Sequence, residues 1–344
     1  MKKCPSCGTL CGNPDLCPKC GTKLTQYRDV PASAPTASPS VSSGAPAASP
    51  ATAAPTPPPT LVARPPKPAP MSIAEALAPF DTVLNPDGKT YTIIRIKDMS
   101  CQSVIIPDCV TTILKKAFCG CGSMTSLYIS DSVTTIESEA FARCHSLPEV
   151  YLPDSVTDIG ERAFADCVSL RGVRLPEKMT YIPVGMFERC LKLPHLYVPD
   201  SVTDIGRMAL MGCADLYWIR LSENLTGISM SMLQGCQTLR IVTIPDSVQK
   251  IDDQAFYGCI NLPALNIPPK VRSIGKHAFQ FCSSLVSLHI PNGVQELGDS
   301  ALAGCTALTH LTLPGSLRHV GKHITTNCKS LTDIKAPFYV KRRL

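Results

Sequence analysis

Apolar and polar positions recur along residues 107–336 in a phrase of 23 residues that is repeated ten times without a slip. In the copy that spans residues 153–175, PDSVTDIGERAFADCVSLRGVRL, apolar residues stand at Val156, Ile159 and Phe164, and an L-x-x-V-x-L pattern ends the phrase. A fixed period of this length is typical of a solenoid, in which stacked coils bury one another's apolar side chains. The terminal pattern predicts one short strand per coil and hence a parallel sheet along one side. The ten copies open at Pro107, Ser130, Pro153, Pro176, Pro199, Ser222, Pro245, Pro268, Pro291 and Pro314.

The residues before the first copy predict an N-terminal cap for the solenoid over residues 71–106. Ser72 and Glu75 form a capping-box pattern, which predicts a short helix that ends before Pro79. A turn signal at 85–88 lies between the run at 82–84 and a strand-like run at 91–96. Such a cap would cover the apolar side and the strand edge of the first coil. Residues 337–344 are expected to form a basic C-terminal tail.

One cysteine stands at the same place in each of the ten copies. A metal or redox array is one interpretation of this recurrence. We favour a buried ladder of free thiols, because side chains stacked about 5 Å apart with parallel directions do not suit disulfide geometry. Cys101, Cys109 and Cys119 have no assigned role. The ladder cysteines are Cys121, Cys144, Cys167, Cys190, Cys213, Cys236, Cys259, Cys282, Cys305 and Cys328.

Two CPxCG pairs near the start of the chain predict a zinc ribbon over residues 1–30. Each pair brings two thiolates close together at a tight turn, and two such turns complete a tetrahedral site for one structural Zn²⁺. Metal binding would supply most of the folding free energy of so small a module. Cys11 is a fifth cysteine without a role in this scheme. The predicted ligands are Cys4, Cys7, Cys17 and Cys20.

Residues 31–70 are rich in proline, alanine, serine and threonine, with almost nothing apolar to bury. This composition predicts a disordered, partly polyproline-II linker between the ribbon and the solenoid. A proline-rich ligand for an aromatic groove is the alternative interpretation of this segment, and a plain spacer is the one we favour.

Charge and hydropathy narrow the function classes further. The formal net charge is +6, and most of it lies in residues 1–70, so the solenoid itself is close to neutral and makes a poor nucleic-acid surface. The start of the chain lacks the apolar region of a secretory signal, and no apolar stretch approaches a membrane span. We therefore expect a cytoplasmic protein, with the cell surface as the alternative. The oligomeric state stays open.

The phrase LPxSVTxIGxxAFxxCxxL, as it stands in these copies, resembles the BspA-like class of leucine-rich repeats over about residues 107–336. The resemblance implies a right-handed leucine-rich-repeat superhelix of ten 23-residue coils, with a parallel β-sheet on one face and loops or short helical turns on the other. It also implies an interaction protein, since members of the class generally bind partners and many are bacterial surface proteins.

The outward-facing positions of the predicted strands form the candidate partner site. In the first half of the repeats these positions carry tyrosine, tryptophan and arginine, the residue types that dominate interface hot spots. Ordinary cross-strand packing is the alternative explanation. The candidate residues are Tyr128, Tyr151, Arg174, His195, Tyr197, Trp218, Arg220 and Ile241.

The sequence favours a non-enzymatic protein-binding scaffold with the zinc ribbon as a second contact module. No nucleophile and base, phosphate loop or dinucleotide fingerprint stands out, and acidic residues that recur at one offset of the repeat indicate turn chemistry. Two alternatives are a surface adhesin and a nucleic-acid-associated factor that acts through the ribbon and the basic tail.

Overall fold

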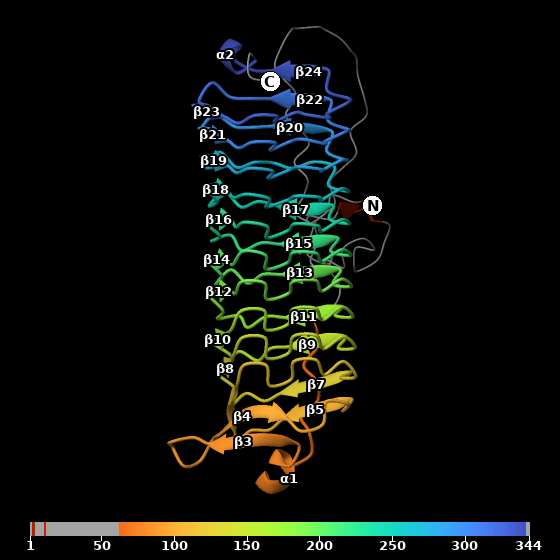
Figure 1. Ribbon diagram of the computed structural model, residues 1–344, viewed down its shortest axis with the longest axis vertical. Coiled ribbons are helices and arrows are strands. Elements are labelled where there is room, and N and C mark those ends of the chain that lie inside the picture. Colours follow the sequence, from red (N-terminus) through yellow and green to blue (C-terminus); the bar gives the residue numbers. More distant parts are fainter. Residues whose placement is uncertain (1, 4–9, 12–61, 342–344) are drawn as a thin grey trace. The chain divides into compact units, whose positions relative to one another are not determined.

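The computed structural model describes residues 2–3, 10–11 and 62–341, in two units that divide after Pro58. In the first unit, β1 (Lys2–Lys3) and β2 (Leu10–Cys11) pair antiparallel. The second unit contains the repeats, which stack as coils along one axis (Figure 1).

Almost every coil adds one strand to each of two parallel ladders, whereas the sequence predicted a single sheet. The exception contributes only an isolated bridge, Ala264 to Ser287, to the first ladder. The paired strands within the repeats keep the 23-residue register, as in Glu149 opposite Gly172 and Thr135 opposite Asp158. The two ladders lie on opposite edges of the coils (Figure 1). The period in the sequence is therefore the length of chain that returns each residue to the same place one coil further on.

The first ladder is the predicted one, and its outward-facing side is called the strand face below. Its strands are β5 (Ser103–Ile106), β7 (Ser126–Ile129), β9 (Glu149–Tyr151), β11 (Gly172–Arg174), β13 (His195–Tyr197), β15 (Trp218–Arg220), β17 (Ile241–Thr243), β20 (Ser287–His289), β22 (His310–Thr312) and β24 (Asp333–Lys335).

The second ladder follows the turn that opens each copy. Its strands are β4 (Tyr91–Ile96), β6 (Val110–Ile113), β8 (Thr135–Ile136), β10 (Asp158–Ile159), β12 (Tyr181–Ile182), β14 (Asp204–Ile205), β16 (Gly227–Ile228), β18 (Lys250–Ile251), β19 (Ser273–Ile274), β21 (Glu296–Leu297) and β23 (His319–Val320).

The stack has about eleven turns rather than ten. The extra turn lies in the region predicted as a cap, because β4 pairs in parallel with β6, and β5 pairs with β7 in the register of the repeats. Its sequence departs from the phrase, which hid it from the period analysis. The cap proper consists of α1 (Ile73–Leu77) and β3 (Phe80–Leu84), which pairs antiparallel with β4. Ser72 caps α1 with both bonds of the predicted capping box.

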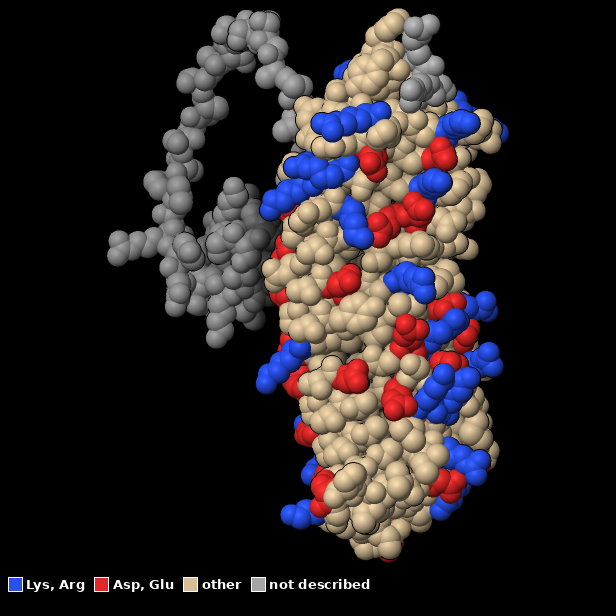
Figure 2. Space-filling view, turned by 60° about the vertical axis from the view of Figure 1, so that its left-hand side comes forward, with Lys and Arg blue, Asp and Glu red and all other residues tan. Residues whose placement is uncertain are grey.

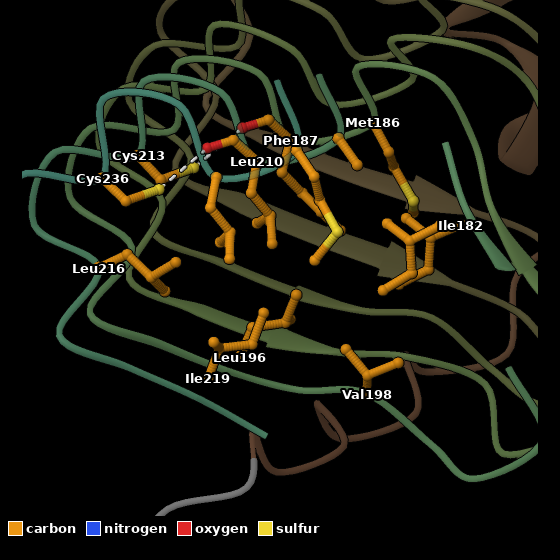
Figure 3. Packing of buried hydrophobic residues seen from close by; sticks show 14 of the residues in the cluster. Ile182, Met186, Phe187, Leu196, Val198, Leu210, Cys213, Leu216, Ile219 and Cys236 are labelled. Atoms are coloured by element: carbon orange, nitrogen blue, oxygen red, sulfur yellow. Dashed lines mark hydrogen bonds between the residues drawn. The ribbon is translucent and has the colours of Figure 1, made fainter. Parts of the chain in front are cut away.

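The core between the ladders is built from identical positions that stack on each other. The phenyl rings of Phe118, Phe141, Phe164 and Phe187 form a continuous column with centroids 4.9, 5.3 and 6.1 Å apart. All four rings are fully buried. Leu210 and Leu233 take the same place in the next two coils, so the column continues in aliphatic form. Figure 3 shows Phe187 beside Leu210 at this transition.

The ladder cysteines are free thiols that connect neighbouring coils, as predicted. From Cys144 onward, each thiol donates to the backbone carbonyl at the phenylalanine position of the preceding coil, at 3.2–3.4 Å. Figure 3 draws two such bonds, from Cys213 to Phe187 and from Cys236 to Leu210. Burial raises the pKa of Cys213 and of Cys282 to about 12, since a thiolate there would lose its water. These thiols therefore stay protonated, which fits packing and argues against metal or redox chemistry.

The C-terminal end is closed by a short helix, α2 (Phe338–Lys341), where the sequence predicted only a basic tail. Val340 is fully buried against the last coil. The Tyr339 hydroxyl donates to the carbonyl oxygens of Gly315 and Leu317. Residues 337–341 thus belong to the folded solenoid.

The linker also ends earlier than predicted, because residues 62–70 contact the solenoid. This segment, called the strap below, has no helix or strand and runs beside the strand face to α1 (Figure 1). Val62, Pro65 and Pro68 are half-buried, and the residues between them are exposed. A three-residue period of burial is that of a polyproline-II helix with one side against a surface.

The thiol ladder makes stability sensitive to alkaline pH. A thiol whose folded pKa is raised stabilises the fold fully below its unfolded pKa of about 8.5, and this contribution is lost as pH rises toward the folded value. We expect the free energy of unfolding, measured with urea in reductant, to fall between pH 8.5 and 10 by about 1.4 kcal/mol per pH unit for each buried thiol. In the variant Cys282→Ala the free energy of unfolding should fall less steeply with pH, by about 1.4 kcal/mol per pH unit, because the variant has one buried thiol fewer. Equal stability at pH 7 and pH 10 would contradict this account.

Candidate functional site on the strand face

The parallel register places the predicted partner residues on one surface. Tyr151 lies beside Arg174, and His195, Trp218 and Ile241 follow one another on β13, β15 and β17. Because the strands are parallel and in register, the same two positions of every coil face outward along the whole ladder.

Two tyrosine–arginine–aspartate units stand two coils apart on this face. In the first, the Arg174 guanidinium lies 5.0 Å from the centre of the Tyr151 ring and 2.8 Å from the Asp154 carboxylate. In the second, Arg220 lies 4.8 Å from the Tyr197 ring and 2.8 Å from Asp200.

Each arginine in these units also donates to a backbone carbonyl of the preceding coil, Arg174 to Leu152 and Arg220 to Val198. The guanidinium is therefore held between a ring, a carboxylate and the backbone. The hydrogen bond from Arg220 lowers the pKa of Asp200, and that from Arg174 lowers the pKa of Asp154. The units are rigid, amphipathic patches of the kind that anchor interfaces.

The face is less open than the sequence predicted. Tyr128 is 6% exposed and Trp218 is 7% exposed, so neither offers a free side chain to a partner. The other six candidates are half-buried: Tyr151, Arg174, His195, Tyr197, Arg220 and Ile241. The accessible part of the candidate site thus centres on the two tyrosine–arginine units.

The strap covers the first part of this face. Arg64 pairs with Asp131, and its guanidinium lies 5.9 Å from the centre of the Tyr151 ring. Lys67 pairs with Asp108 at 2.8 Å. These carboxylates raise the pKa of Arg64 and of Lys67. At the other end of the strap, Val62 lies so close to Gly172 that an added Cβ there would stand 2.6 Å from Val62 Cγ2.

An acidic edge runs beside the strand face over seven successive coils. The residue that follows the opening position of each copy is acidic and exposed in these coils, and becomes Pro269, Asn292 and Gly315 in the last three. The sequence interpreted this recurrence as turn chemistry only. The strap basic residues pair with the first two members, which gives the edge a second role as a partner for cations. Its members are Asp108, Asp131, Asp154, Glu177, Asp200, Glu223 and Asp246.

Elsewhere acidic and basic side chains are interspersed along the visible side of the solenoid (Figure 2). In the part of the chain that the structure describes, no three His, Cys, Asp or Glu residues converge as a metal site, and no helix could cross a membrane. The predicted zinc ligands Cys4, Cys7, Cys17 and Cys20 lie outside the described residues. The hollow lined by Arg272, Gln295 and Arg318 is open and gathers no nucleophile with a base.

A protein-family model described as "BspA type Leucine rich repeat region" matches residues 96–217 and 203–332 in six copies. Among solved structures, a T. pallidum leucine-rich repeat protein is 31% identical, with 60% of this chain and 88% of that chain covered and a TM-score of 0.48. A leucine-rich cell surface protein from Faecalibacterium prausnitzii is 24% identical, with coverages of 77% and 95% and a TM-score of 0.46. A Bacteroides ovatus leucine-rich repeat protein is 22% identical, with coverages of 76% and 94% and a TM-score of 0.43. No curated protein matches the chain.

The second tyrosine–arginine unit allows a direct measurement of its ion pair. In a double-mutant cycle with Asp200→Asn and Arg220→Met, we expect a coupling of about 0.5 kcal/mol at neutral pH, because both side chains are partly exposed to screening solvent. The coupling should persist above the unfolded carboxyl pKa of about 3.9 and vanish as pH falls through the lowered folded value. Urea denaturation at pH 7 and pH 2.5 measures both. A coupling that is the same at both pH values would show that charge plays no part in it.

Proposed function

Since this chain belongs to the BspA-type leucine-rich repeat family, whose members are generally non-enzymatic, we propose that it is a protein-binding scaffold. The observation that carries the proposal is the pair of tyrosine–arginine–aspartate units on the strand face. A rigid ladder presents both units at fixed separation, so a partner meets preorganised aromatic and guanidinium groups and loses little entropy in ordering them.

The region around Tyr197 and Arg220 is the proposed contact centre. Tyrosine and arginine combine a large apolar area with directional donors, which is why such residues carry much of the free energy of many interfaces. The face changes beyond Thr243, where Asn266, Ser287 and His289 are exposed and no described residue forms a comparable unit. This contrast within one ladder supplies an internal control.

Affinity capture with three baits tests the proposed contact centre. Wild-type protein and a control variant, Asn266→Ala with His289→Ala, should recover the same partner from nuclease-treated lysate. The variant Tyr197→Ala with Arg220→Ala should recover at least tenfold less of it, while its circular dichroism stays that of the wild type. Trp218 is left unchanged because it is buried and its removal would disturb the coil. Equal recovery by all three baits would remove the Tyr197–Arg220 region as the site.

The proposal includes a zinc-stabilised ribbon at residues 1–30 as a second contact module. Two CPxCG pairs support it, since four thiolates at this spacing complete a tetrahedral zinc site. Two linked modules that engage one assembly gain avidity without new contacts within either module.

Metal analysis of the purified protein tests the ribbon. We expect one Zn²⁺ per chain by inductively coupled plasma mass spectrometry, and a loss of most of it in Cys4→Ser with Cys20→Ser. Cys11→Ser should keep the metal, because Cys11 stands outside both pairs. The thermal unfolding of the solenoid should be unchanged in all variants, since the ribbon belongs to a separate unit. A metal-free wild type, or zinc that survives the double substitution, would refute the assignment.

We place the protein in the cytoplasm, which suits the many reduced cysteines of the repeats. A surface role is the second candidate, because one similar solved structure is described as a cell surface protein. Release of fragments of this chain by protease treatment of washed intact cells would favour the surface role.

A further inference from the structure

The strap binds the strand face as a ligand would, and its contacts are specific. Its half-buried residues Val62, Pro65 and Pro68 recur every third position, so one side of an extended helix lies against the solenoid. Tyr128, at 6% exposure, lines the same hollow as Lys67 and Pro68, and the Tyr151 ring lies under Arg64. Polyproline-II segments commonly dock in grooves lined by aromatic side chains.

The basic residues of the strap form a second side with the same period. Arg64 and Lys67 are three positions apart, and they pair with Asp131 and Asp108 on neighbouring coils of the acidic edge. Arg64 also faces the Tyr151 ring, whose other neighbour is Arg174. Arg64 thus contacts both a tyrosine ring and a carboxylate, and Lys67 contacts a carboxylate one coil away.

The spacing of the solenoid matches that of the strap. One polyproline-II turn rises about 9.3 Å. Neighbouring strands of a parallel ladder are about 4.8 Å apart, so a strand and its second neighbour are about 9.6 Å apart. The strap uses this match: the five steps from Val62 to Lys67 carry it from Gly172 on β11 to Asp108 after β5, three strands away. An extended proline-rich segment thus rises along the ladder at nearly the strand spacing, and the long side chains of Arg64 and Lys67 reach carboxylates on neighbouring coils.

The tyrosine–arginine units share this spacing. Tyr151 and Tyr197 stand two coils apart, which is one polyproline-II turn. The acidic edge continues past the strap through Glu177, Asp200, Glu223 and Asp246. A segment longer than the strap would meet a second tyrosine and further carboxylates along the same path.

We propose that the strand face and its acidic edge form a receptor for extended, proline-rich segments that carry a basic residue at every third position. The strap is the resident copy of this ligand and occupies the β5–β11 part of the receptor. A partner segment of the same chemistry takes that seat in competition with the strap. This inference rests on the proposed function, because it names the class of partner that the strand face binds.

The glycine at position 172 indicates that the strand face is shaped to accommodate the strap. The equivalent outward position holds Glu149 one coil earlier and Trp218 two coils later, whereas at position 172 even an added Cβ would stand 2.6 Å from Val62 Cγ2. The φ angle of Gly172 is not in the left-handed region, so local backbone conformation does not require glycine here. Space for the strap is the reason that the structure offers for it.

The test uses the full-length chain and a fluorescent peptide with the sequence of residues 62–70, VARPPKPAP, followed by anisotropy. In the wild type the tethered strap, at an effective concentration on the order of millimolar, outcompetes the free peptide. Two variants release the strap by different routes: Arg64→Glu with Lys67→Glu reverses its charges, and Gly172→Trp fills its space. We expect both to bind the peptide at least tenfold more tightly than the wild type.

Two controls separate this recognition from general stickiness. The peptide VAEPPEPAP, with reversed charges, should bind neither released variant but should bind the chain with Asp108→Lys and Asp131→Lys. A peptide with Pro65 and Pro68 replaced by glycine should bind the released variants at least fivefold more weakly than VARPPKPAP. A chain that carries both charge reversals, in the strap and in the acidic edge, should restore the ion pairs. The strap should then occupy its site again and exclude every peptide.

Peptide affinity that is equal in wild type and both released variants, or that ignores the charge reversals, would overturn the inference. If the peptides do not bind, while the variant Tyr197→Ala with Arg220→Ala still loses the captured partner, then proline-rich segments are not the ligand and the proposed function stands. If the peptides bind as expected while that capture is unaffected, the receptor stands and the Tyr197–Arg220 contact centre falls.

Discussion

Each coil of this protein completes its backbone hydrogen bonds and its apolar contacts with the coils on either side. The two parallel ladders, the thiol-to-carbonyl bonds and the phenylalanine column each connect one turn to the next at a fixed sequence offset. An isolated coil would leave its apolar side chains and ladder groups unsatisfied, so stability arises from neighbour contacts along one dimension. A change of length within one coil would break all of these connections together, which explains the strict 23-residue period.

The same constraint requires closed ends. The first turn is covered by α1 and β3, with Phe80 packed edge-on against the first phenylalanine of the column. The last turn is covered by α2 through Val340. Both caps depart from the repeat because they must bury one side and present the other to solvent. This departure is also why the period in the sequence placed the start of the stack one turn too late and left the C-terminal helix unrecognised.

Regular stacking turns the surface into a lattice. Any residue type that recurs at one position becomes a row, as the acids of the acidic edge do, and the rows are spaced by the distance between strands. A ligand with its own regular rise can match such a lattice along its length, and an extended proline-rich segment has a suitable rise. The strap lies along that direction, with its cations toward the carboxylates and Arg64 also over the Tyr151 ring. The interaction surface is thus a property of the repeat and not of one coil.

The sequence by itself determined the period, the buried positions and the free thiol ladder, because these follow from which residues recur and at what spacing. It also placed Tyr151, Arg174, Tyr197 and Arg220 on one face, since parallel strands in register must align equal offsets. It could not show that Tyr128 and Trp218 are buried, because their cover depends on packing in three dimensions. The strap was hidden for the same reason: its composition predicts a linker, and only the tertiary structure brings Arg64 and Lys67 to carboxylates that lie 67 and 41 residues further along the chain. Local patterns encode contacts within and between coils, whereas the contact between a non-repeating segment and the face depends on a surface that exists only after the coils have stacked.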